Sequence, residues 1–126
     1  MRKSRILLVE DDADIAEALK DVLTDQGHAV RTARNGKDAL VALADGELPQ
    51  LIFLDLMMPL MDGAQFREAQ LKDARISRIP VVLVSADRGV AERALEMGVD
   101  AWLAKPTTPE RLLAAAERYA SHPPPT

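Results

Sequence analysis

The chain has 126 residues, 48% of them hydrophobic and 29% charged, with a formal net charge of −4, which is typical of one globular domain with a hydrophobic core. No apolar run approaches the ~20 residues of a transmembrane helix, and the short basic N-terminus is unlike a signal peptide, so we expect a cytoplasmic protein that does not bind membranes. No segment concentrates Lys and Arg, so we expect no direct binding of nucleic acid. The chain has no cysteine and only two histidines, His28 and His122, which excludes disulfides, thiolate zinc sites and histidine-rich metal sites.

Short apolar runs alternate with helical patterns along the chain. The predicted order is strand Arg5–Val9, helix Ala13–Gln26, strand Ala29–Ala33, helix Asn35–Ala44, strand Leu51–Leu54, helix Gly63–Asp73, strand Pro80–Val84, helix Val90–Met97, strand Ala101–Leu103 and a last helix that ends near Ala120. The helical periodicity of Gly63–Asp73 is poor. Strands that alternate with helices in this way predict a parallel sheet covered on both faces.

The start of the last helix is left open by one residue. Thr107 with Glu110 forms a capping box, whereas Thr108 followed by Pro109 forms an N-cap with Pro at the first helical position. The tail His122–Thr126 reads HPPPT and is expected to be a free end or the start of a linker.

Polar residues follow four of the predicted strands. They are Glu10, Asp11 and Asp12 after the first strand, Asp55 after the third, Ser85 after the fourth and Lys105 after the fifth. Each alone has a structural explanation, such as a helix cap, a turn residue or a surface lysine. Because the carboxyl ends of parallel strands meet at one edge of a sheet, their joint placement predicts a functional site there.

Clustered carboxylates raise one another's pKa unless a cation lies between them. A small set of oxygen ligands suits Mg²⁺, which retains several waters and accepts phosphate as a further ligand. A carboxylate beside Mg²⁺ can act as a nucleophile toward phosphorus and form an acyl phosphate, and a lysine can stabilise the charge of the transferred group. This chemistry explains why Asp55 is kept within an apolar stretch, where an unpaired carboxylate is unfavourable.

Four segments, ILLVEDD, LDLMMPLMDG, VVLVSA and DAWLAKP, together resemble the receiver domain of bacterial two-component response regulators. The resemblance covers about residues 4–120 and implies a flavodoxin-like (βα)5 fold, a doubly wound parallel sheet with strand order 2-1-3-4-5. We therefore expect a receiver domain over residues 1–121, followed by the Pro-rich tail 122–126.

The resemblance implies a role in phosphoryl transfer for three residues. Asp55 would be the phosphoacceptor, Lys105 would bind a phosphoryl oxygen, and the Ser85 hydroxyl would follow the phosphoryl group. The Lys105–Pro106 peptide would be cis, as in most relatives.

The same resemblance implies a magnesium site. Its ligands would be Asp11, Glu10, Asp55 and the backbone carbonyl of Met57, with Asp11 the more direct of the acidic pair. Asp62 is interpreted as a helix cap or turn residue rather than as part of the site.

Two departures from the family pattern concern the output surface. The interval from Ser85 to Lys105 is slightly shorter than is common in the family, and we place the shortening within Ala86–Val90, before the fourth helix. That region usually forms the output surface, so a phosphorylation-dependent homodimer, which some relatives form, stays open. Trp102 occupies the position of the family's rotating aromatic, usually Tyr or Phe, and its larger indole should turn inward less readily.

The expected function is a phosphorylation-controlled signalling module rather than an enzyme that acts on other molecules. Its partners would be a sensor histidine kinase or a histidine phosphotransfer protein, and a downstream protein or fused output domain. Asp12-Ala13-Asp14 also resembles the nucleophile motif of haloacid-dehalogenase-type phosphatases, but the chain leaves no room for a cap domain and Asp14 should be helical. A degenerate receiver that serves only as a docking module is the third alternative.

Overall fold

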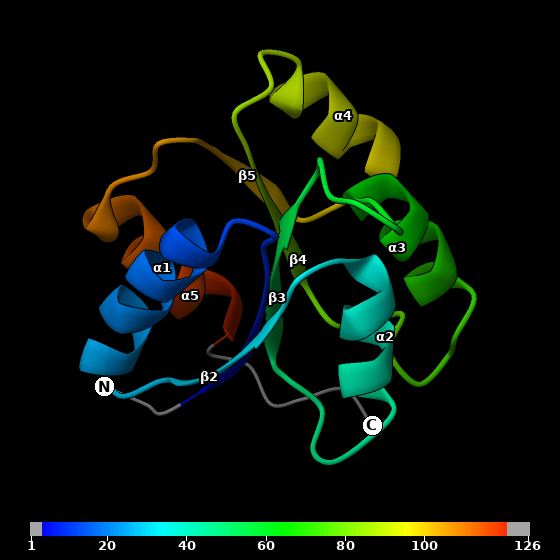
Figure 1. Ribbon diagram of the computed structural model, residues 1–126, viewed down its shortest axis with the longest axis horizontal. Helices are drawn as coiled ribbons and strands as arrows, with labels where there is room; N and C mark the ends of the chain where they lie inside the picture. Colours follow the sequence, from blue (N-terminus) through cyan, green and yellow to red (C-terminus); the bar gives the residue numbers. More distant parts are fainter. Residues whose placement is uncertain (1–3, 121–126) are drawn as a thin grey trace.

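The computed structural model describes residues 4–120, so the predicted tail and the domain boundary at 121 lie outside the described residues. Helices and strands alternate as the sequence predicts (Figure 1). The elements are β1 (Arg5–Val9), α1 (Ala13–Asp25), β2 (Ala29–Ala33), α2 (Gly36–Leu43), β3 (Leu51–Asp55), α3 (Gly63–Leu71), β4 (Val81–Ser85), α4 (Val90–Met97), β5 (Ala101–Ala104) and α5 (Pro109–Ala120). Within residues 4–120, no helix has the length and apolarity needed to cross a membrane.

The strands form one parallel sheet in the order β2-β1-β3-β4-β5, which confirms the predicted flavodoxin-like, doubly wound fold. The chain moves outward from β1 to β2 in one direction and from β3 to β5 in the other. The order therefore reverses between β1 and β3, and folds of this kind bind ligands outside the carboxyl ends of the strands at such a point.

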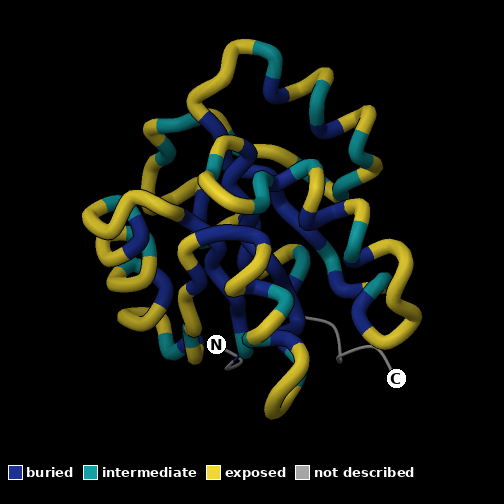
Figure 2. Tube along the Cα trace, turned by 45° about the vertical axis from the view of Figure 1, so that its right-hand side comes forward, coloured by how far each residue is buried: buried dark blue, intermediate teal, exposed yellow. Residues whose placement is uncertain are grey.

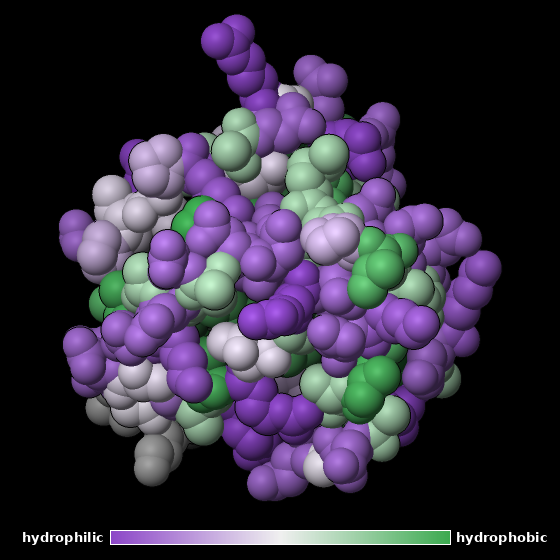
Figure 3. Space-filling model, in the orientation of Figure 1, coloured by the Kyte–Doolittle hydropathy of each residue, from purple (hydrophilic) through white to green (hydrophobic). Residues whose placement is uncertain are grey.

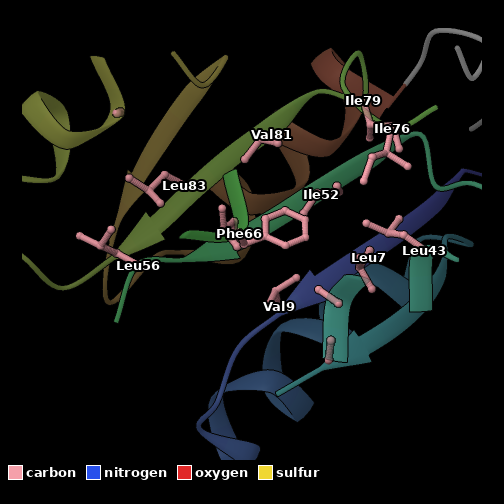
Figure 4. Packing of buried hydrophobic residues seen from close by; sticks show 14 of the residues in the cluster. Leu7, Val9, Leu43, Ile52, Leu56, Phe66, Ile76, Ile79, Val81 and Leu83 are labelled. Carbon is pink, nitrogen blue, oxygen red and sulfur yellow. The ribbon is translucent and has the colours of Figure 1, made fainter. Parts of the chain in front are cut away.

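The two faces of the sheet carry separate hydrophobic clusters because side chains alternate along each strand. Helices α2, α3 and α4 cover one face, where Phe66 of α3 packs among residues of the central strands (Figure 4). Helices α1 and α5 cover the other face, where Phe53 of β3 packs against Leu23 and Leu112. The central strands β1, β3 and β4 are buried, whereas the edge strands β2 and β5 and the outer faces of the helices are partly exposed (Figure 2). Polar residues predominate on the face seen in Figure 3.

The strand ends differ from the prediction in a way that affects the site. Asp55 and Ser85 are the last residues of β3 and β4 rather than the first residues of the loops. Asp55 pairs with Val84 and Ser85 pairs with Ala104 in the ladder. Both polar side chains are thus attached to backbone that the sheet fixes.

The start of α5 is resolved in favour of Thr108. The Thr108 Oγ1 accepts a hydrogen bond from the Arg111 N–H at 3.2 Å, and Pro109 is the first helical residue. This arrangement is the N-cap followed by Pro. Proline suits the first helical position because a backbone N–H there would have no partner within the helix.

Helix α3 has poor periodicity because two of its inward positions are polar. Arg67 is 8% exposed and Gln70 is 0% exposed, alongside the apolar Phe66. Arg67 donates to the carbonyls of Met97 and Gly98, and Gln70 donates to two carbonyls of the segment before β4. A hydrophobicity pattern cannot reveal an inward face that is held by hydrogen bonds.

Candidate functional site

Three carboxylates meet at the point where the strand order reverses. Val9 pairs with Leu54, so the residues that follow them, Glu10 and Asp55, arrive side by side at the carboxyl ends of β1 and β3. One carboxylate oxygen from each of Glu10, Asp11 and Asp55 lies within 4.8 Å of the others. Glu10 and Asp55 are buried while Asp11 is exposed, so the cluster opens to solvent on the Asp11 side.

Lys105 lies between the two buried carboxylates. Its Nζ forms an ion pair with Glu10 Oε1 and lies 3.3 Å from Asp55 Oδ2. The sequence placed Lys105 at the same edge of the sheet as the acids but gave no indication of the ion pair with Glu10. The pairing has a plain physical reason, because buried carboxylates without a cation nearby are strongly unfavourable.

The pKa values reflect this crowding. Burial raises the pKa of Glu10 to about 7, and the neighbouring Asp55 adds to the effect while Lys105 opposes it. Burial disfavours the ammonium of Lys105, but the carboxylates of Glu10 and Asp55 outweigh burial and raise the pKa of Lys105. Glu10 therefore titrates near neutral pH, whereas Lys105 remains a cation throughout that range.

Ser85 contacts the loop that leads to α4. Its Oγ accepts a hydrogen bond from the Asp87 N–H at 3.1 Å, and its carbonyl accepts one from the Lys105 N–H at 2.9 Å. Ser85 is thereby fixed beside Lys105 at the ends of β4 and β5. Trp102, which pairs with Leu83 on the edge strand β5, is 44% exposed, so the predicted aromatic position faces outward.

Asp12 and Asp62 have structural roles. Asp12 Oδ1 accepts hydrogen bonds from the N–H groups of Asp14 at 3.0 Å and Ile15 at 3.1 Å, and it caps α1. Asp62 forms a capping box with Gln65 at the start of α3, as expected. Because the Asp12 carboxylate is bonded to the helix and Asp14 lies within α1, the structure lends no support to the Asp12-Ala13-Asp14 phosphatase motif.

The donor set fits a hard divalent cation. The side chains that converge here offer only carboxylate oxygens, which are the ligands that Mg²⁺ prefers. Met57, the further ligand expected from its backbone carbonyl, lies in the loop directly after β3 with its side chain exposed. Sequence reasoning missed Gly36, which contacts this loop from the start of α2. Its only signal was the Asn-Gly pair that marks the helix start.

A shallow apolar hollow of about 370 Å³ adjoins Lys105. Its lining includes Ile15 and Ala18 of α1 together with Pro106 and Thr107 of the loop after β5. The Lys105–Pro106 peptide is cis, as the resemblance implies.

The sheet order, the acidic cluster at its reversal point and the lysine between the acids define a flavodoxin-like protein with an acidic site whose carboxylates could hold a cation. The family model of the response regulator receiver domain matches residues 6–117. The chain therefore belongs to the receiver domain family of response regulators, which places it in two-component signalling.

Known relatives agree with this assignment. The chain is 37% identical over 113 residues to the probable transcriptional regulator ycf27 of Porphyra purpurea, a match that covers 88% of this chain and 45% of the relative. It is 33% identical, with a TM-score of 0.85, to the signal receiver domain of a histidine kinase from Syntrophus aciditrophicus, covering 94% of this chain and 90% of that one. It is 25% identical, with a TM-score of 0.83, to the phosphorylated cyanobacterial phytochrome response regulator RcpA, a match that covers 99% of this chain and 100% of that one. The chain spans about half the length of the curated relatives it matches.

Proposed function

We propose that this receiver domain accepts a phosphoryl group on Asp55 from a phosphohistidine of a sensor histidine kinase or a phosphotransfer protein. An Asp55 carboxylate oxygen attacks phosphorus, the P–N bond to the imidazole breaks, and an acyl phosphate forms. The observation that carries the proposal is Lys105, which lies between the buried carboxylates of Glu10 and Asp55. A cation in this place neutralises the acceptor and can bind the phosphoryl oxygen that arrives.

The residues that would hold Mg²⁺ are the carboxylates of Asp11, Glu10 and Asp55 and the backbone carbonyl of Met57. When bound, the ion supplies positive charge at the transferred phosphoryl oxygens. Asp11 is the solvent-exposed member of the cluster, so it is the accessible ligand at the mouth of the site. Glu10 is held by Lys105 and by the Asp12 N–H at 3.2 Å, which orients its carboxylate.

The output of the domain would be a change in surface shape rather than turnover of another substrate. The Ser85 hydroxyl, which accepts a bond from the Asp87 N–H, would turn to donate its O–H to a phosphoryl oxygen, and Trp102 would respond on β5. The recipient would be a downstream protein or a fused output domain. Several relatives named as transcriptional regulators are about twice as long as this chain, which supports the second arrangement.

Intact-mass measurement with acetyl phosphate tests the acceptor. We expect one added phosphoryl group in the wild type, only with Mg²⁺ present, and none in Asp55→Asn. Asp62→Asn is the matched control, because Asn also caps helices and Asp62 is the last residue of the loop that follows Asp55. Full labelling of Asp55→Asn would show that the acceptor is another residue.

The apolar hollow beside Lys105 supports an approach path for the phosphodonor protein. Any donor must reach Asp55 past this rim, so Ile15→Glu should slow transfer from the donor protein while labelling by acetyl phosphate is unchanged. Equal slowing of both reactions would show that Ile15 is a packing residue, a role that its half-buried position also permits.

A further inference from the structure

The loop between β3 and α3, residues 56–62, contains a strained turn. Leu60 has a φ of 65°, in the left-handed region that a leucine rarely adopts. The Met61 N–H donates to the Pro59 carbonyl at 2.7 Å, which closes a three-residue γ-turn around Leu60. The form of this turn with positive φ is rare and strained. The Leu60 side chain is 82% exposed, so its own packing does not hold the turn in place.

Gly36 holds the turn from outside. Gly36 is the first residue of α2, and its N–H donates to the Met61 carbonyl at 2.8 Å. The first amides of a helix have no partner within the helix, so this amide is available for the loop. A Cβ at position 36 would lie 2.7 Å from Met61 Cγ and 2.9 Å from the Met61 carbonyl oxygen. The loop can approach α2 this closely only because residue 36 has no side chain.

The need for glycine at position 36 comes from this contact rather than from backbone conformation. The glycines with positive φ among the described residues are Gly27, Gly46 and Gly98. Gly36 is buried within a helix, where alanine is ordinarily the more favourable residue.

The other side of the loop is held in a similar way. The Gly63 N–H donates to the Leu56 carbonyl at 2.9 Å. A Cβ on Gly63 would lie 2.4 Å from the Asp55 carbonyl oxygen, so α3 starts directly against the backbone of the acceptor residue. The loop is thus held between two glycines, one on α2 and one on α3.

We propose that Gly36 is a positioning residue for the cation of this site: its amide and its bare α-carbon hold the strained turn at Leu60 and so fix the backbone of Met57 for cation binding. The proposal rests on the proposed function, because it takes the Met57 carbonyl as a ligand. A ligand that is already held in place loses little freedom when the cation binds. Strain that persists beside a functional residue is maintained by its surroundings, and Gly36 supplies the contact that maintains it.

Gly36→Ala tests the proposal by calorimetric titration with Mg²⁺. We expect the Mg²⁺ dissociation constant to rise about tenfold, the lower end of the loss when a group that orients a metal ligand is removed. The midpoint of thermal unfolding in the absence of Mg²⁺ should change little, because alanine favours the helix while it displaces Met61. Gly89→Ala is the matched control at the start of α4, where a Cβ would meet Asp87 Oδ1 at an ordinary 3.5 Å. It should leave the Mg²⁺ affinity unchanged.

A second measurement uses the wild type and does not depend on whether the variant folds. Because linkage is reciprocal, Mg²⁺ must stabilise the contact that favours its binding. The Gly36 amide should exchange slowly with deuterium for a residue at a helix start, and more slowly still with saturating Mg²⁺. Unchanged exchange on adding Mg²⁺, or unchanged Mg²⁺ affinity in a folded Gly36→Ala, overturns the proposal.

The experiments can refute the role of Gly36 without refuting the metal site. If Asp11→Ala abolishes Mg²⁺ binding while Gly36→Ala leaves it intact, the metal site stands and the role of Gly36 is wrong. If the wild type binds no Mg²⁺ in the calorimeter, both the metal site and the role of Gly36 are wrong.

Discussion

Arg67 is a buried cation on α3, and its replacement by leucine has a cost that can be worked out from its contacts. Its guanidinium donates to the carbonyls of Met97 at 3.0 Å and Gly98 at 2.6 Å, which are the last carbonyls of α4. It also donates to Gln70 Oε1 at 2.8 Å. Burial lowers the pKa of Arg67, an effect that the charge of nearby Asp100 opposes.

The bonds of Arg67 differ in what their loss would leave behind. The two carbonyls of α4 lie at a partly exposed helix end where water can replace the guanidinium, so we assign them roughly 1 kcal/mol together. The side chain of Gln70 is fully buried, and leaving its Oε1 without a donor costs roughly 2 kcal/mol. Arg67→Leu should therefore lower the free energy of unfolding by about 3 kcal/mol, or the melting temperature by roughly 10 °C.

Urea denaturation followed by circular dichroism measures this change, and a double-mutant cycle assigns it. Arg67→Leu combined with Gln70→Leu should lose about 1–2 kcal/mol less than the sum of the single variants, because the Gln70 Oε1 that Arg67→Leu alone leaves without a donor is then absent. Lys72→Leu, at the C-cap of the same helix, is the control, since the exposed ion pair of Lys72 with Glu68 should contribute under about 1 kcal/mol. A loss for Arg67→Leu no larger than that of the control would refute the reasoning.

The remaining predictions concern the site itself. Burial raises the pKa of Glu10 from 4.5 to about 7. In the metal-free protein, the stability that protonated Glu10 contributes should therefore be lost as pH rises across that range. Urea denaturation should show this decrease in the wild type but not in Glu10→Gln. Mg²⁺ affinity, measured by titration, should rise as Glu10 ionises near pH 7. Asp11→Ala should weaken Mg²⁺ binding more than Glu10→Ala, whereas Asp12→Ala should mainly destabilise α1, by about 1 kcal/mol for a lost cap. Finally, adding beryllofluoride after Mg²⁺ should change the fluorescence of Trp102, but not in Asp55→Ala; unchanged emission with Asp55 occupied would make Trp102 a fixed surface residue.

The alternation of apolar runs and helical patterns was sufficient to predict a parallel sheet covered on both faces, whereas the strand order came from the resemblance to receiver domains. Strands buried on both faces read as continuous apolar stretches, and glycine and capping residues marked the helix ends. The errors at element ends were one or two residues. Asp55 and Ser85 were placed after their strands because a polar residue looks like the end of an apolar run, whereas in the structure the ladder continues through both.

For the site, the sequence predicted only that certain polar residues lie together at the carboxyl-terminal edge of the sheet. Parallel strands bring their carboxyl ends together, so Glu10, Asp55 and Lys105 could be placed near one another without knowledge of distances. The ion pair of Lys105 with Glu10 and the contact of Gly36 with Met61 depend on how separate elements pack, and no local pattern encodes either. The polar inner face of α3 was missed for the same reason.

The contacts of α4 show how a change at the site could reach the surface. The N-cap of the helix is Gly89, which offers no side-chain cap. Asp87 connects this end of the helix to Ser85. The Asp87 N–H donates to the Ser85 hydroxyl, and the Asp87 carboxylate accepts from the Gly89 N–H at 2.9 Å. Its other end is bound by the guanidinium of Arg67 on α3, which itself starts against the backbone of Asp55. If the Ser85 side chain turns or moves so that its hydroxyl donates to a phosphoryl oxygen, the bond that this hydroxyl accepts from the Asp87 N–H is displaced with it, whereas the bonds of Arg67 are unaffected. The N-terminal end of α4 is therefore the end that should move, while the C-terminal end remains attached to α3, the helix that follows the Asp55 loop.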